Sequence, residues 1–241
     1  MDGVSSLFDE TLTHLHDGAL RPMSVLRGSL LTSLWVPGRG VNDIDLLVDG
    51  TWTPQSLTPV LERAFLTLRA EARDFIVIWA ETDNPGVRAT VRRGAELVQV
   101  DFGWGERLAV PPIDTLVRGR TWRAVTPEVM FGWKVHSLVE HGPRGRWHAK
   151  TIADLYLMLR HVRLQKTLVR SCLDAAFASQ GMPLSTLDGF LDDPTWGQSR
   201  GSRNKWKSYM KKSPWVTFTL AEAFPVVRDA VDDLLRNNSR G

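Results

Sequence analysis

The segment VNDIDLLVDG, residues 41–50, limits the possible fold more than any other part of the chain. Aliphatic residues alternate there with Asp43 and Asp45, which predicts a β-strand with both carboxylates on one face. Two carboxylates about 4 Å apart repel by roughly 4 kcal/mol at an effective dielectric constant of about 20. The alternation therefore predicts a half-buried strand whose polar face binds a cation.

A later segment, LVQVDF, repeats the pattern and adds a third carboxylate, Asp101. Upstream, Gly28-Ser29 follows a short apolar run and begins a helical pattern, with a 13-residue spacer before Asp43. Glycine at such a turn lets the backbone approach a phosphate, and a helix N-terminus supplies free N–H groups. The three aspartates Asp43, Asp45 and Asp101 would bind Mg²⁺ or Mn²⁺, hard cations that prefer oxygen ligands. Together these residues predict a metal site for phosphoryl or nucleotidyl transfer.

Each part of this pattern has a simpler alternative. An aspartate-rich strand end can be a polar turn, and we expect this role for Asp49, which precedes Gly50. The Asp-x-Asp pair also occurs in glycosyltransferases, and a Gly-Ser dipeptide alone predicts nothing. The combination of all three parts in this order favours the metal site.

Sequence patterns predict an α/β (α+β) fold, with a mixed sheet at the N-terminus and a helical C-terminal domain. We expect a catalytic core at 1–108, a connector at 109–125 and a helical domain at 126–241. Helices are predicted near 5–16, 29–36 and 54–72, and near 126–141, 148–164, 165–179, 200–212 and 217–236. A buried strand is predicted at 74–81 and a hairpin with its turn near Gly94, whereas 181–199 is predicted to be a loop.

Composition excludes several classes of protein. The single cysteine, Cys172, excludes an internal disulfide framework and cysteine-based zinc sites. No apolar run approaches the roughly 20 residues that cross a membrane, and the first residues lack the features of a secretory signal. The sequence therefore predicts a cytoplasmic protein without a membrane partner.

Positive charge is concentrated in residues 200–212, which contain six basic residues and no acidic one, with Trp206 and Tyr209 interleaved. Basic and aromatic side chains together can hold phosphates and stack on bases. The alternative is a solvated helix face with two aromatic residues directed to the core. The candidate RNA-binding residues are Arg203, Lys205, Trp206, Lys207, Lys211 and Lys212.

The order of these motifs resembles the nucleotidyltransferase superfamily of DNA polymerase beta. Within it, VTPEVMFGWKVHSL followed by KTIADLYLML resembles the AbiEii/AbiGii toxins, which include the MenT toxins. The resemblance covers residues from about 24 to 160. It implies that Gly28 and Ser29 hold the β- and γ-phosphates of an NTP and that Lys134 binds the triphosphate.

The same resemblance implies roles for three further residues. Lys150 and Asp154 belong to the family's Lys-x-x-x-Asp-Leu segment, which faces the nucleotide, and Asp154 would lie in the active cleft. Arg39 fits the Arg-x-x-x-Asp-x-Asp pattern of the family. The sequence alone leaves two alternatives open, namely that Lys134 is an ordinary helix-surface lysine and that Lys150 and Asp154 form an i,i+4 salt bridge.

The function implied is that of a nucleotidyltransferase toxin of a toxin–antitoxin (type IV, AbiE-like) system. Such a toxin transfers NMP from NTP to RNA, here the 3′ end of tRNA, and has a cognate antitoxin protein as partner. A nucleotidyltransferase or kinase that modifies a small molecule, such as an antibiotic, or a protein hydroxyl is the enzymatic alternative. A protein that binds RNA or a partner through an inactive site is the non-enzymatic alternative.

Overall fold

The computed structural model describes residues 6–41, 43–79, 86–140, 148–193 and 195–236, and the chain divides into two compact units. The first unit comprises Met1–Leu31, Val41–Glu106 and Pro112–Val125. The second comprises Thr32–Gly40, Arg107–Pro111 and Thr126–Gly241. Each unit is therefore assembled from three separate segments of the chain. Within the described residues, no helix has the length and apolar character needed to cross a bilayer.

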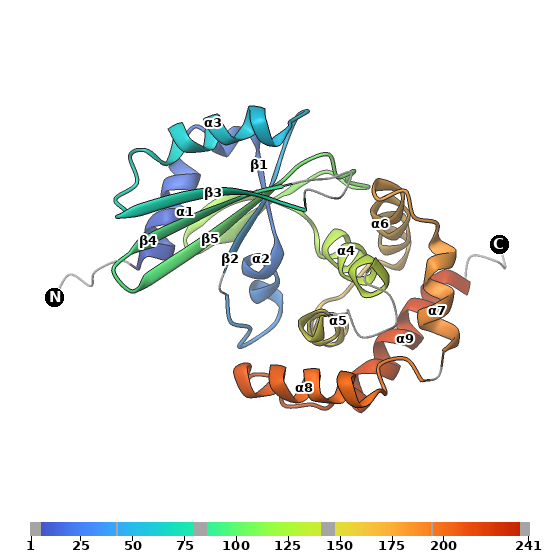
Figure 1. Cartoon of the computed structure of the whole chain (residues 1–241). Coiled ribbons are helices and arrows are strands. Elements are labelled where there is room, and N and C mark those ends of the chain that lie inside the picture. Colours follow the sequence, from blue (N-terminus) through green and yellow to red (C-terminus); the bar gives the residue numbers. More distant parts are fainter. Residues whose placement is uncertain (1–5, 42, 80–85, 141–147, 194, 237–241) are drawn as a thin grey trace. The chain divides into compact units, whose positions relative to one another are not determined.

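The first unit is built on one seven-stranded sheet, drawn in blue to green in Figure 1. Its order is β3-β4-β5-β2-β1-β7-β6, in which β2–β5 and β1–β7 are parallel and the other neighbours antiparallel. The strands are β1 (Ser24–Arg27), β2 (Asp43–Val48), β3 (Ala72–Ile78), β4 (Gly86–Arg93), β5 (Glu96–Gly103), β6 (Ile113–Val117) and β7 (Arg120–Ala124). The predicted mixed α/β sheet followed by helices is confirmed.

The core of this unit follows from the alternation seen in the sequence. Ile44 and Leu46 of β2 and Val100 of β5 are fully buried, while Asp43 and Asp45 lie on the opposite face and are partly exposed. Helices α1 (Leu7–Asp17) and α3 (Pro54–Phe65) add apolar side chains, and each begins at a hydroxyl cap. The Ser6 hydroxyl accepts from the Asp9 N–H, and Thr53 forms a reciprocal capping box with Ser56.

Two elements differ from their predictions because long-range strand pairing overrides the local pattern. Helix α3 ends at Phe65 and not near residue 72, because the chain from Ala72 onward pairs with β4. Strand β3 is an edge strand and not a buried one, with Ile76 and Val77 exposed by 53% and 46%. A short apolar run does not distinguish a buried strand from an apolar edge strand.

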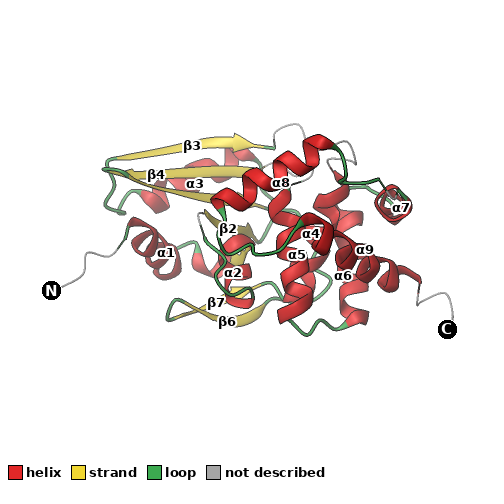
Figure 2. Ribbon diagram, turned by 90° about the horizontal axis from the view of Figure 1, so that it is seen from below, coloured by secondary structure: helices red, strands yellow, loops and turns green. Residues whose placement is uncertain are grey.

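Residues 113–124 form a hairpin of the sheet where the sequence predicts a connector. Figure 2 shows β6 and β7 as neighbouring strands. Their two-residue turn places Arg118 at φ 47° and Gly119 at φ 78°, and positive φ at both positions is typical of the type I′ hairpin turn. The dipeptide Arg118-Gly119 between two short alternating runs is therefore the sequence signal of this hairpin.

The second unit is helical. Its helices are α4 (Pro127–Glu140), α5 (Ala149–His161), α6 (Lys166–Ser179), α7 (Asp188–Asp192), α8 (Arg200–Lys212) and α9 (Leu220–Arg236). Helix α2 (Gly28–Trp35) begins in the first unit and ends in the second. Within residues 181–199, predicted as a loop, the structure adds α7 and a 3₁₀ turn at Leu184–Leu187.

Helices α4 and α6 approach each other closely at Gly132. A Cβ atom built on Gly132 would lie 2.9 Å from the backbone carbonyl carbon and oxygen of Cys172. Because backbone atoms cannot rotate away as a flexible side chain can, any larger residue at position 132 would move the helices apart. Gly132 therefore determines where α4 places its side chains, including Lys134 two residues later.

We expect Gly132→Ala to lower the free energy of unfolding by about 1–3 kcal/mol, since the added methyl group overpacks a backbone contact. The matched control is Gly189→Ala in α7, where a Cβ meets no atom within 4 Å. The control is expected to be neutral or to gain up to about 1 kcal/mol from alanine's higher helix propensity. Urea unfolding of both variants measures the difference, and equal stabilities would contradict the close-packing interpretation.

Candidate functional site

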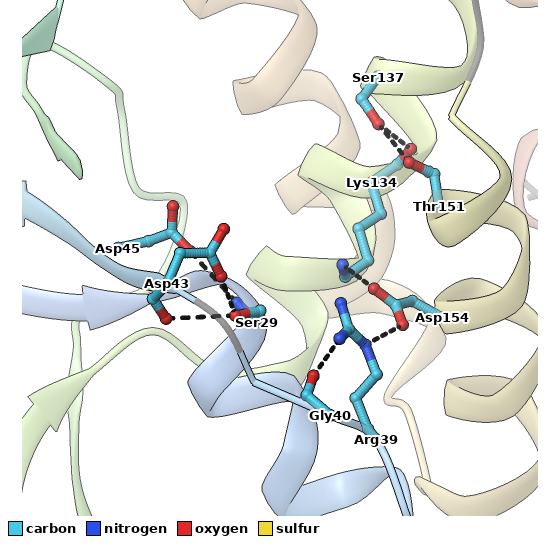
Figure 3. Close-up of polar contacts among 9 residues, drawn as sticks. All are labelled: Ser29, Arg39, Gly40, Asp43, Asp45, Lys134, Ser137, Thr151 and Asp154. Atoms are coloured by element: carbon cyan, nitrogen blue, oxygen red, sulfur yellow. Dashed lines mark hydrogen bonds and ion pairs between the residues drawn. The ribbon is translucent and has the colours of Figure 1, made fainter. Parts of the chain in front are cut away.

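Gly28 and Ser29 lie where β1 ends and α2 begins, and both contact the aspartates of β2. Gly28 has a φ of +75°, and a Cβ there would lie 1.8 Å from Asp45 Oδ2, so only glycine fits. The Ser29 N–H donates to Asp45 Oδ2 at 3.2 Å, and the Ser29 hydroxyl donates to the Asp43 carboxylate (Figure 3). The Gly-Ser dipeptide thus fixes the positions of Asp43 and Asp45.

The sheet brings the three predicted aspartates to one place. Asp45 and Asp101 are direct partners in the parallel pairing of β2 with β5, and Asp43 precedes Asp45 by two residues on the same face. This juxtaposition follows from the register of two strands more than 50 residues apart in the sequence. The three carboxylates therefore share one region of the sheet, as the pattern of alternation predicts.

Three further charged residues, which the sequence reasoning missed, surround the aspartates. Arg88 of β4 binds Asp101 with two parallel hydrogen bonds, Nε to Oδ1 at 2.6 Å and Nη2 to Oδ2 at 2.7 Å. Arg27, opposite Asp45 in the β1–β2 pairing, forms a largely buried ion pair with Glu106. We define Asp43, Asp45, Asp101, Glu106, Arg27 and Arg88 as the carboxylate cluster.

The signal for Arg88 is the hairpin register. With the turn near Gly94, Arg88 of β4 comes to lie directly opposite Asp101 of β5. The register of a hairpin with this turn is therefore the sequence signal that would place Arg88 beside Asp101. Arg27 and Glu106 are 79 residues apart, and no local pattern connects them.

The carboxylate cluster carries excess negative charge. Withdrawal from water and the neighbouring charge of Asp43 raise the pKa of Asp45 to about 6, although Arg27 acts in the opposite direction. Burial lowers the pKa of Arg27, but the charges of Glu106, Asp45 and Asp101 outweigh it, so that the net shift is upward. With every group ionised, four carboxylates and two guanidinium groups leave a formal charge of −2. One divalent cation would neutralise this charge.

The donor set fits a hard cation held by two carboxylates. Both oxygens of Asp101 accept from Arg88, so Asp43 and Asp45 are the aspartates that would hold Mg²⁺ or Mn²⁺. Magnesium in proteins is commonly bound by one or two carboxylates together with substrate phosphates. Among the residues described, no three acidic, histidine or cysteine side chains are arranged to hold a metal by themselves. Binding by Asp101 would therefore require that Arg88 moves away.

We expect Asp45→Asn to stabilise the protein in a pH-dependent way. Because the pKa of Asp45 is higher in the folded protein than its ordinary 3.8, the unfolded chain loses this proton first as the pH rises. The free-energy cost that ionised Asp45 imposes on folding is absent near pH 4, grows up to about pH 6 and then stays constant. Thermal unfolding without divalent cations should show a gain of ~1–2 kcal/mol for Asp45→Asn at pH 7.5 and almost none at pH 4. An equal gain at both pH values would contradict the raised pKa.

A second group of charged residues lies within the second unit. Lys134 Nζ donates to Asp154 Oδ2 at 2.7 Å, and Arg39 Nε donates to Asp154 Oδ1 at 2.9 Å (Figure 3). Asp154 is fully buried, and burial raises its pKa, but Lys134 and Arg39 together shift that pKa below the ordinary value. Arg39 also lies over the ring of Trp215, 5.3 Å from its centroid. We call Arg39, Lys134 and Asp154 the Asp154 triad.

The Asp154 triad decides between the alternatives that the sequence leaves open. The Lys134 side chain is only 15% exposed, so it is not an ordinary helix-surface lysine. Lys150 is exposed, and among the described residues its i,i+4 ion pair with Asp154 does not form. Asp154 instead forms ion pairs with Arg39 and Lys134. A contact of 3.4 Å between the hydroxyls of Ser137 and Thr151 also joins α4 to α5.

The predicted RNA-binding residues lie on α8. Arg203, Lys207, Lys211 and Lys212 are exposed, and Lys205 is partly exposed. Trp206 is only 3% exposed and packs near Tyr209 and Phe218, so its ring is directed to the interior. Helix α8 thus combines a basic outer face with a buried aromatic side chain.

No protein-family model matches the chain, and no curated protein matches its sequence. Among solved structures, it is similar to JHP933 from Helicobacter pylori, with 15% identity and a TM-score of 0.47 over 97% of this chain and 91% of that one. An antigenic nucleotidyltransferase-like protein from Paracoccidioides brasiliensis matches with 15% identity and a TM-score of 0.46, over 90% and 91% of the two chains. The antibiotic-resistance factor ANT(2″)-Ia matches with 21% identity and a TM-score of 0.44, over 73% and 91%.

Proposed function

We propose that this protein is a metal-dependent nucleotidyltransferase that transfers NMP from an NTP to an acceptor hydroxyl and releases pyrophosphate. The observation that carries the proposal is the carboxylate cluster. Asp43, Asp45 and Asp101 meet on one face of the sheet, beside a Gly-Ser turn that admits no side chain at position 28. Their excess negative charge favours a divalent cation together with the phosphates that accompany it.

Each residue has a proposed part in the reaction. Asp43 and Asp45 hold the cation, which when bound neutralises phosphate charge and favours ionisation of the attacking hydroxyl. The acceptor oxygen forms a bond to the α-phosphorus, the bond from that phosphorus to the bridging oxygen breaks, and pyrophosphate leaves with the electron pair. Asp101 accepts the hydroxyl proton after Arg88 has moved away from its carboxylate. Gly28 and Ser29 bind the β- and γ-phosphates at the N-terminus of α2, where the helix dipole favours negative charge.

Lys134 is the proposed ligand of the triphosphate, and Asp154 and Arg39 position it. Two ion pairs with Asp154 hold Lys134 and Arg39 in fixed orientations. A buried carboxylate shared by two cations leaves one excess positive charge in the triad, and this excess charge suits an anionic ligand. Lys150 is exposed and is proposed to assist in binding the nucleotide.

We further propose that the acceptor is RNA, at the 3′ end of tRNA, and that the protein acts as a toxin with a cognate antitoxin. Two features support this proposal: the resemblance of residues 24–160 to the AbiEii/AbiGii toxins and the basic outer face of α8. Addition of nucleotides to that end would block aminoacylation and hence translation.

Incubation with total tRNA, Mg²⁺ and each α-³²P-labelled NTP, resolved on a denaturing gel, tests both parts of the proposal. Label on tRNA is expected with one or two of the nucleotides and with none when EDTA is added. Metal-dependent pyrophosphate release without labelled RNA would reject the RNA acceptor but retain the transfer chemistry, and a small molecule or protein would then be tested as acceptor. Absence of any NTP turnover with all three kinds of acceptor would reject the enzyme.

A further inference from the structure

The second unit contains a cavity between α8 and α9 that involves no residue of the carboxylate cluster or the Asp154 triad. Its volume is about 560 Å³, within the range of about 300–1,000 Å³ that is typical of small-molecule sites. Most of its lining is apolar or aromatic, and it includes Trp196, Trp206, Met210, Leu220, Phe224 and Pro225. A volume of this size is far larger than a packing defect, since voids in protein interiors rarely exceed the size of a water molecule.

The aromatic walls of this cavity are flat and rigid. The rings of Trp196 and Phe224 are stacked, with centroids 5.1 Å apart and an interplanar angle of 9°. Trp206 contributes a third ring, and its Nε1 is buried without a hydrogen-bond partner among the described residues. The aromatic side chains that line the cavity favour a planar ring over a branched aliphatic group, because a planar ring can stack on an aromatic face.

Two cations line the same cavity. Arg203 and Lys207 are four residues apart on α8, so they lie on one face of the helix, and both are exposed. Arg203 donates to the backbone oxygen of Gln198 at 2.7 Å, which orients its guanidinium group. No acidic residue occurs among the described residues that line the cavity. An apolar pocket with two cations beside it selects a ligand that combines an apolar body with an anionic group.

We propose that this cavity binds a nucleotide, with the base against the aromatic walls and the phosphate at Arg203 and Lys207. A free nucleoside monophosphate and an unpaired terminal nucleotide of RNA present the same chemistry. The proposal does not depend on the transfer reaction, because its residues are distinct from those of both charged groups. It also gives the basic residues of α8 a more defined role than general attraction of phosphates.

Binding is measured by ligand-observed NMR titration. The parent protein is the Asp43→Asn variant of the full chain, and EDTA is present, so that metal-dependent nucleotide binding does not contribute. The ligands are the four nucleoside monophosphates, a single-stranded RNA trinucleotide, a blunt RNA duplex and octanoate, an aliphatic anion. Lys207→Glu removes a cation at the cavity, and Ala221→Trp fills the cavity from an exposed position in its lining. Arg200→Glu is the matched control, since Arg200 is exposed on the same helix but does not line the cavity.

We expect saturable binding of a monophosphate, weakened at least about fivefold by Lys207→Glu and abolished by Ala221→Trp. Arg200→Glu should change the affinity by less than about twofold, because a more distant exposed charge is screened. If the trinucleotide binds more tightly than the duplex and the monophosphates, the nucleotide comes from an RNA end. If a monophosphate binds as tightly as the trinucleotide, the ligand is a free nucleotide. The inference is overturned if octanoate binds more tightly than every nucleotide, if Ala221→Trp has no effect, if the two charge reversals act equally, or if no nucleotide binds.

Discussion

Replacement of Asp43 by asparagine is expected to lower the rate of nucleotidyl transfer by roughly 10²–10³-fold. Asparagine has the shape of aspartate and its amide oxygen can still accept the Ser29 hydroxyl, so the local structure should be retained. The variant loses one of the two carboxylates proposed to hold the cation, and the charge of the cluster falls from −2 to −1. The effect should therefore lie in chemistry and metal affinity and not in stability.

Initial rates of label transfer from an α-³²P NTP to tRNA, with Mg²⁺ varied, measure this loss. Asp49→Asn is the matched control, because Asp49 follows the same strand but is about half exposed and pairs with Arg123. The control should keep the activity of the unmodified protein, and both variants should unfold within a few degrees of it. Full activity of Asp43→Asn would exclude Asp43 as a cation ligand.

Replacement of Asp154 by asparagine is expected to lower the free energy of unfolding by about 3–5 kcal/mol. The substitution leaves Arg39 and Lys134 largely buried without their counter-ion, and an uncompensated buried charge costs more than the loss of an exposed pair. The melting temperature should fall by roughly 10 °C in a chain of this size. Because the pKa of Asp154 is lowered in the folded protein, its contribution is complete at neutral pH and is lost in strong acid.

The matched control for this prediction is Asp174→Asn. Asp174 pairs with Arg170 on α6 at i,i+4 spacing, and its side chain is 52% exposed, so its loss should cost less than about 1 kcal/mol. Differential scanning calorimetry of both variants at pH 7.5 gives the comparison. If Asp154→Asn unfolds at the same temperature as the control, the triad does not stabilise the second unit.

Local patterns predict the strands and turns that carry the carboxylates but not the charges that surround them. Strand Asp43–Val48 lies within the segment 41–50 that predicts it, and the helix predicted at 29–36 begins one residue earlier, at Gly28, because alternation and turn chemistry act over a few residues. Arg27 and Glu106 come together only through the order of the strands, which the sequence does not specify. The exposed edge at β3 is a consequence of the same strand order.

For the Asp154 triad, the sequence identifies the residues but not their relation to one another. The resemblance implies roles for Lys134 and Asp154, whereas the i,i+4 spacing of Lys150 and Asp154 predicts a pair between those two residues. The buried pair forms instead between two helices, α4 and α5, because packing at Gly132 and the Ser137–Thr151 contact determines which side chains meet. Helical periodicity describes one helix at a time and contains no information on this packing.

The interleaving of the two units limits how the protein can be divided. Thr32–Gly40 and Arg107–Pro111 belong to the second unit although they precede Thr126 in the chain. A fragment that ends at Val125 would retain both segments without their partners, and a fragment that begins at Thr126 would lack Arg39 of the Asp154 triad. Chimaeras that exchange the C-terminal helices between related proteins must therefore exchange residues 32–40 and 107–111 with them, as one compatible set.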